Sequence, residues 1–124
     1  MRSKASVRRL AVKLNSVTIV FGAALITGSA IADSVEDMCS KSSETCACAA
    51  KQLKSEVGEN DYGLYEAVGI AYIANQSAGM GLGDAWDAAV KAVSNERGSG
   101  FVATLSKTNA IGKTHRKAIK ACAE

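Results

Sequence analysis

Residues Tyr62–Ser77 read YGLYEAVGIAYIANQS, and Glu66 is the only charged side chain among them. On a helix, the apolar side chains of this stretch would mark two faces, and Tyr62, Tyr65 and Tyr72 would lie around the remaining face. A helix that is apolar almost all round is usually buried on several sides. Gly63 and Gly69 weaken such a helix locally but allow a neighbouring backbone to approach closely. We therefore expect an all-α bundle around a central helix at about 61–78, shielded from water on nearly every side.

The sequence before this stretch predicts one helix and both of its ends. Four residues recur there at helical spacing and form an apolar inner stripe: Cys46, Ala50, Leu53 and Val57. Ser43 or Thr45 is the expected N-cap of this helix, and Gly58 is its expected C-cap. Asn60 or Asp61 is then expected to cap the central helix.

The remaining segments bring the expected number of helices to four or five. Residues 33–43 are polar and typical of a short helical turn or a tethered arm. Asp84 is the expected N-cap of a third main helix, which breaks at residues 95–100. Residues 101–123 keep one apolar stripe throughout, and Gly112 favours two helices there over one bent helix. No proline and no alternating run typical of a strand occurs in the sequence.

The first 32 residues are typical of a signal peptide. Five basic residues fall within the first 13 positions, and an uncharged, mostly apolar run, Val17–Ile26, follows them. The triplet Ala30–Ala32 matches the small-x-small pattern of cleavage sites. We expect cleavage after Ala32, which leaves residues 33–124 as a single helical domain. The alternative is an uncleaved signal anchor.

Removal of this segment changes the charge of the protein. Residues 1–32 hold five of the fifteen basic residues and none of the twelve acidic ones, so the remaining ten and twelve give a net charge of −2. That charge gives no support for nucleic-acid binding. We expect a periplasmic or secreted protein with no stable membrane anchor after cleavage. The pair Arg8-Arg9 leaves both a Sec signal and a twin-arginine signal open.

Four cysteines in an exported chain of this size predict two disulfides. Cys46 and Cys48 are two positions apart on a helix and point in roughly opposite directions, so they should not pair with each other. Because Cys46 and Cys122 both lie on inner stripes, we expect them to pair, with Cys39 bonded to Cys48. The alternative is Cys39 bonded to Cys46 and Cys48 to Cys122.

The loop Gly79–Gly83 is the most unusual segment because its three glycines alternate with Met80 and Leu82. The plainer interpretation is a turn between helices with both side chains packed into the core. The functional interpretation is a mobile lip that contacts a ligand or a partner protein, with Trp86 beside it.

Charge is unevenly distributed along the mature chain. Residues 33–66 contain eight carboxylates and three lysines, whereas five basic residues lie between positions 107 and 120. Mutual attraction of these two segments is the plainer interpretation. A free basic face that meets anionic lipid or an acidic partner is the alternative.

Catalytic patterns are not found in the sequence. His115 is the only histidine, and its place between apolar residues of the last stripe favours a core or core-edge position. We find no nucleophile elbow, phosphate-binding loop, dinucleotide fingerprint or metal-ligand spacing. We therefore expect no enzyme activity and no cofactor.

These observations predict a small exported, non-catalytic protein that binds a partner protein or a small ligand. A role in envelope stress or in inhibition is suggested only by analogy with other small exported helical proteins, which share the size and the expected localisation. The alternative is a periplasmic redox or metal-binding protein that uses the cysteines and His115.

Overall fold

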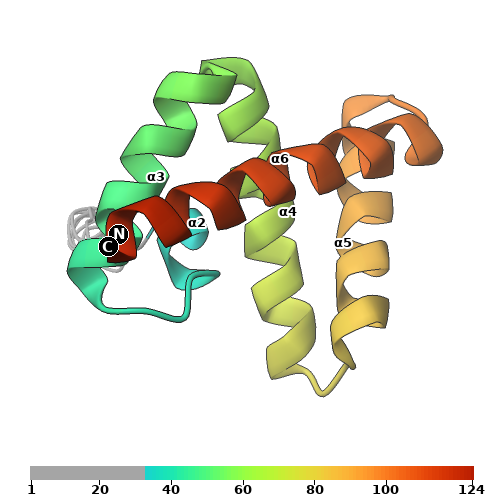
Figure 1. Ribbon diagram of the computed structural model, residues 1–124. Helices are drawn as coiled ribbons and strands as arrows, with labels where there is room; N and C mark the ends of the chain where they lie inside the picture. The colour runs from blue at the N-terminus through green and yellow to red at the C-terminus, as the bar shows by residue number, and fades with distance from the viewer. Residues whose placement is uncertain (1–32) are drawn as a thin grey trace, which may run out of the picture. The chain divides into compact units, whose positions relative to one another are not determined.

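A computed structural model describes residues 33–124, which form five helices and no strand (Figure 1). The helices are α2 (Ser34–Asp37), α3 (Ser43–Val57), α4 (Glu59–Ser77), α5 (Leu82–Arg97) and α6 (Phe101–Ala123). The expected all-α bundle with two disulfides is confirmed. The expected signal peptide and the cleavage point after Ala32 lie outside the described residues. Within those residues, no helix is both long enough and apolar enough to cross a membrane.

Helix α4 holds the bundle together, because every other helix packs against it. Helix α5 runs beside it as its antiparallel neighbour, and α6 crosses α3, α4 and α5 in front (Figure 1). One buried cluster joins α2, α3, α4 and α6: Val35, Ala50, Leu53, Tyr62, Tyr65 and Ile111. A second buried cluster joins α4 to α5: Val68, Ala89, Val90 and Val93. These two clusters set the relative positions of α4, α5 and α6, which enclose the candidate site described below.

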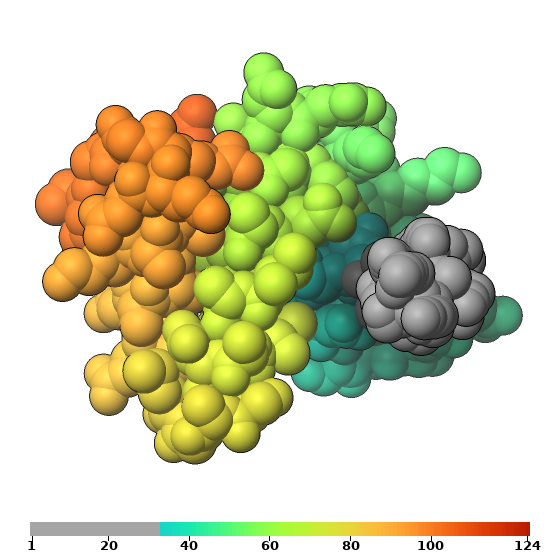
Figure 2. Space-filling view, turned by 180° about the vertical axis from the view of Figure 1, so that it is seen from behind, coloured from blue at the N-terminus to red at the C-terminus, as the bar shows by residue number. Residues whose placement is uncertain are grey.

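The expectation that α4 is shielded on nearly every side is wrong for its second half. Tyr62, Tyr65 and Val68 are buried, but Ile70 is 61% exposed and Ala74 is also exposed. Beyond Gly69 the α2–α3 layer ends and α5 is the main neighbour of α4 (Figure 1). Seen from behind, α4 and α5 lie side by side with one face of each open to solvent (Figure 2). The apolar stretch is therefore buried mainly by α2, α3 and α6 in its first half and mainly by α5 in its second half.

Several helix ends also differ from expectation. Ser42, not Ser43 or Thr45, caps α3: its Oγ accepts a hydrogen bond from the backbone N–H of Thr45 at 3.2 Å. Gly58 ends α3 as predicted, with φ at +91°, a value that favours glycine. Gly58 also precedes α4 directly, so the sharp turn leaves no separate capping residue.

Three further boundary predictions need correction. Asn60 and Asp61 lie inside the first turn of α4, which has no side-chain cap. Asp84 likewise lies inside the first turn of α5, where its charge suits the helix dipole. Helix α6 is one uninterrupted helix across Gly112. A Cβ built on Gly112 would lie 3.7 Å from Tyr65 Oη, an ordinary contact distance, so Tyr65 of α4 packs against this turn of α6, and packing against α4 outweighs the glycine's low helix propensity.

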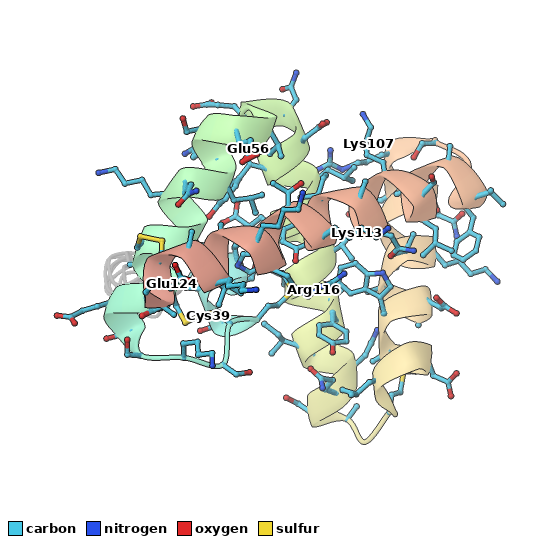
Figure 3. All side chains as sticks on the ribbon, viewed as in Figure 1. Cys39, Glu56, Lys107, Lys113, Arg116 and Glu124 are labelled. Atoms are coloured by element: carbon cyan, nitrogen blue, oxygen red, sulfur yellow. A yellow bond between two sulfur atoms is a disulfide. The ribbon has the colours of Figure 1, made fainter. Side chains whose placement is uncertain are left out.

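The preferred disulfide pairing is wrong, and the alternative pairing is the one in the structure. Cys39 is bonded to Cys46 and Cys48 to Cys122, with Cα–Cα distances of 5.6 and 6.0 Å. Cys46 is buried and faces the segment after α2, which carries Cys39. Cys48 is on the opposite, exposed side of α3, where the end of α6 passes (Figure 3). The error was to assume that α6 meets the inner stripe of α3, when its end meets the outer side.

The two bridges should contribute unequally to stability. In a chain-entropy treatment, closing the 74-residue separation of Cys48–Cys122 contributes about 4 kcal/mol, and closing the 7-residue separation of Cys39–Cys46 contributes about 2.5 kcal/mol. We predict that Cys48→Ser/Cys122→Ser lowers the free energy of unfolding more than Cys39→Ser/Cys46→Ser does. Denaturant unfolding measures both, and an equal or reversed order would contradict the assignment.

Helix α2 docks closely onto α4 at Gly69. A Cβ on Gly69 would lie 2.7 Å from Met38 Cε and 3.1 Å from Ser34 Oγ. Ser34 Oγ donates a hydrogen bond to the carbonyl oxygen of Glu66 at 2.8 Å. Asp33 fixes the start of α2, since it caps the Val35 N–H and accepts a hydrogen bond from Tyr62 Oη. Gly69 therefore permits this close approach, and a side chain there would require Met38 and Ser34 to shift.

Two glycine-to-alanine variants of α4 test this docking. Gly63→Ala has nothing within 4 Å of the new Cβ, so it should raise stability by about 0.5–1 kcal/mol through helix propensity. Gly69→Ala should lose this gain, because the new methyl displaces Met38 and crowds Ser34. Thermal unfolding of the two variants should separate them by several degrees, and equal stabilisation would contradict the close approach.

Candidate functional site

A partly open cavity of about 550 Å³ lies between α4, α5 and α6. Helix α4 contributes Tyr65 and Tyr72, and α5 contributes Trp86. One face of α6 closes the opposite side, because residues three and four positions apart lie on the same side of a helix. The residues of α6 that line the cavity are Thr108, Asn109, Gly112, Lys113, His115, Arg116 and Ile119, and Met38 completes the lining.

Three aromatic rings form one wall of this cavity. Trp86 makes edge-to-face contacts with Tyr65 at 6.1 Å and with Tyr72 at 5.2 Å between ring centroids. Each such pair stabilises the arrangement by about 0.5–1.5 kcal/mol beyond burial alone. Trp86 Nε1 donates a hydrogen bond to Asn109 Oδ1 at 3.0 Å, which fixes the indole relative to α6. The wall is thus held in place from both sides.

His115 lies buried beside this wall. Its Nδ1 is 3.0 Å from Tyr65 Oη, and the two rings meet edge to face at 5.5 Å. Among the described residues, its Nε2 has no hydrogen-bond partner. Burial lowers the pKa of His115, opposed by the charge of Asp33 and reinforced by that of Arg116. Burial raises the pKa of Tyr65 to about 12, so both rings are neutral at pH 7.

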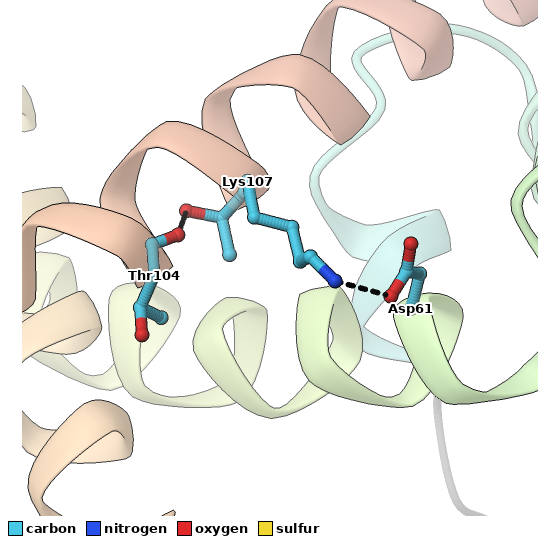
Figure 4. Close-up of polar contacts among 4 residues, drawn as sticks. Asp61, Thr104 and Lys107 are labelled. Carbon is cyan, nitrogen blue, oxygen red and sulfur yellow. Dashed lines mark hydrogen bonds and ion pairs between the residues drawn. The ribbon is translucent and has the colours of Figure 1, made fainter. Parts of the chain in front are cut away.

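Two cations stand at the edge of the cavity. Lys113 and Arg116 line it and are both exposed (Figure 3). Within residues 33–124, the ion pair between Lys107 Nζ and Asp61 Oδ1, at 3.2 Å, is the one salt bridge present (Figure 4). Direct pairing of the acidic and basic segments is therefore limited to this contact, and Lys113 and Arg116 take no part in it.

The sequence analysis grouped Met80, Leu82 and Trp86, but only Trp86 of the three lines the cavity. Met80 is 45% exposed and Leu82 64% exposed, and neither lines the cavity. The interpretation that packs both into the core is therefore wrong. Leu82 starts α5, so the loop is limited to residues 78–81. Met80 in this loop and Leu82 in the first turn of α5 are both exposed.

Sequence reasoning missed the site itself, but it noted part of the signal. Tyr62, Tyr65 and Tyr72 were grouped on one face of the central helix, and the last two now line the cavity. The corresponding sequence signal for the α6 side of the cavity is a helical spacing of three and four positions, which puts four lining residues on one face: Asn109, Gly112, Lys113 and Arg116. It was read as part of a basic segment, so its role as a cavity wall was not found. The core-edge position expected for His115 is confirmed.

The groups that line the cavity are aromatic, polar and basic. They include one histidine, two tyrosines, one lysine and one arginine, without a serine, cysteine, aspartate or glutamate. The Thr108 hydroxyl donates to backbone carbonyls of its own helix. All four cysteines are in disulfides, and the described residues contain no group of three or more His, Cys, Asp or Glu suited to a metal ion. A metal site that uses a cysteine would require reduction of a bridge.

Comparison of the chain with models of protein families, with curated proteins and with solved structures gave no match. The geometry of the cavity is therefore the basis for the proposals that follow.

The neutral state of His115 predicts a specific pH dependence of stability. Because its pKa is lowered in the folded protein, the unfolded chain takes up a proton first as the pH falls below about 6.5. The contribution of His115 to the free energy of unfolding is therefore complete above about pH 6.5. It is lost as the pH falls from there towards the lower pKa of His115 in the folded protein. We predict that His115→Gln, which does not titrate, flattens the fall in unfolding free energy between about pH 7.5 and 5.5. Identical slopes for the two proteins would contradict a neutral, buried His115.

Proposed function

We propose that this protein is an exported, non-catalytic binding protein that holds a small ligand with an apolar or aromatic body in the cavity between α4, α5 and α6. The single observation that carries the proposal is the wall formed by Tyr65, Tyr72 and Trp86. Ligand pockets of several hundred cubic ångströms lined by aromatic side chains with a few convergent polar groups are typical of small-molecule sites.

The two disulfides support export, because such bridges persist in oxidising compartments. We place the mature protein, residues 33–124, in the periplasm or outside the cell. The signal-like features of residues 1–32 agree with this placement.

A protein partner is a second candidate, and a separate surface favours it. A shallow groove runs between α4 and α5 on the face seen in Figure 2, which we call the α4–α5 groove. Its apolar residues are Ala67, Ile70, Ala71, Ala74, Ala92 and Val93. Met80 and Leu82 expose further apolar surface on the segment that connects the two helices. Exposed apolar patches of this kind often mark interaction sites.

Energy transfer from Trp86 tests the ligand-binding proposal. Trp86 is the only tryptophan of the chain, so its emission reports on one place. The probe is N-phenyl-1-naphthylamine, a neutral fluorophore whose emission rises in apolar surroundings. We predict saturable binding with tryptophan-sensitised emission, and about tenfold weaker binding by Tyr72→Ala, since one ring of the wall is removed.

Two control variants keep this test specific. Ile70→Ala also truncates a large side chain of α4, but in the α4–α5 groove, and should bind the probe like the wild type. Met80→Ser/Leu82→Ser should behave likewise. Loss of probe binding in the latter variant, with Tyr72→Ala unaffected, would place the contact at the exposed tip and contradict the proposal.

A further inference from the structure

The charged side chains that line the cavity are all positive, and Asp33, whose charge reaches His115, does not line it. Lys113 and Arg116 line it, and none of the residues that line it is an aspartate or glutamate. Neither cation forms an ion pair with any carboxylate in residues 33–124. Three residues apart on α6, they lie on the same face of the helix. A cavity with unpaired cations and no anion attracts a negatively charged group.

The chemistry of Arg116 and Lys113 narrows the kind of anion. The planar guanidinium of arginine matches a carboxylate or sulfonate through two parallel hydrogen bonds, and the lysine adds a mobile positive charge. His115 places a further nitrogen, Nε2, among the residues that line the cavity, and this buried atom has no partner within the described part of the chain.

The apolar side of the cavity faces a different part of the ligand. Tyr65, Tyr72 and Trp86 offer aromatic surface, and Met38 and Ile119 add aliphatic surface to the lining. A ligand that fits both sides carries one negative group and a flat apolar body of one or two rings, which a cavity of about 550 Å³ can hold.

We infer that the cavity selects small aromatic acids, with the carboxylate or sulfonate between Lys113 and Arg116 and the ring system against Tyr65, Tyr72 and Trp86. This inference rests on the proposed function, because it names the ligand class for the same cavity. The two cations supply selectivity for the charge, and the rings supply most of the apolar contact area.

A matched pair of probes separates charge selectivity from apolar binding. 8-Anilino-1-naphthalenesulfonate and N-phenyl-1-naphthylamine share the same two-part aromatic body and differ by one sulfonate. The full mature protein, with both disulfides intact, is titrated with each probe at low salt. We predict that the sulfonate binds about tenfold more tightly, as expected for one charge-assisted contact near the surface.

Paired charge variants identify the cations responsible. Lys113→Gln/Arg116→Gln should abolish the preference for the sulfonate while binding of the neutral probe stays within about twofold of the wild type. Lys91→Gln/Lys117→Gln removes the same net charge from exposed positions that do not line the cavity, and should keep the preference. Circular dichroism and thermal unfolding confirm that each variant is folded.

The outcomes distinguish the two proposals. If neither probe binds the wild type, the proposed ligand-binding function fails and the inference fails with it. If both probes bind equally, or if the two charge variants behave alike, the cavity binds apolar bodies without selecting acids. That second result overturns the inference and leaves the proposed function standing.

Discussion

The contact of Tyr65 with α6 is the interaction on which the rest of this structure depends. Its ring is buried in the cluster that joins α2, α3, α4 and α6, and its hydroxyl meets His115 at 3.0 Å. The same ring touches the edge of Trp86 on α5 and approaches the backbone of α6 at Gly112. One side chain therefore joins the three helices that enclose the cavity. At this crossing α6 buries Thr108, Ile111 and His115, and the cavity lies where Tyr65 holds the helices together but does not fill the space between them.

The disulfides hold the periphery of this arrangement. A domain of this length buries only about two-thirds of its surface and is marginal without covalent support. Cys39–Cys46 fixes the short α2 segment against the start of α3, and Cys48–Cys122 fixes the end of α6 to the outer side of the same helix. With both ends of the domain attached to α3, α6 can lie across the bundle as a single long helix (Figure 1). Its middle then forms a cavity wall, and its cations lie at the edge of that wall.

Local sequence signals predicted the helices well, because helical spacing, Gly58 and the break near Gly98 depend on neighbouring residues. The disulfide pairing could not be predicted, because it depends on which side of α3 the end of α6 passes, a tertiary fact. Ile70 shows the same limit: its apolar surroundings in sequence indicated burial, but none of the helices in residues 33–124 covers that side of α4. The candidate site was predictable only in its parts. Helical spacing grouped Tyr65 and Tyr72 on one face and indicated a core or core-edge position for His115. That these residues line one cavity with Arg116 could not be predicted, because it depends on how α6 crosses α4.

The state of His115 is the most direct report on this account, because burial against Tyr65 and the orientation of α6 must both be right for it to hold. Nitrogen-15 chemical shifts of its ring can be followed by NMR from about pH 8 to pH 5, across the ordinary histidine pKa of about 6.5. The account predicts that burial lowers the pKa of the ring, so that it stays neutral to a lower pH than an exposed histidine does, with a hydrogen-bonded Nδ1 and an Nε2 resonance that shifts when 8-anilino-1-naphthalenesulfonate is added. A ring that titrates like that of an exposed histidine, and whose Nε2 is unaffected by the probe, would contradict it.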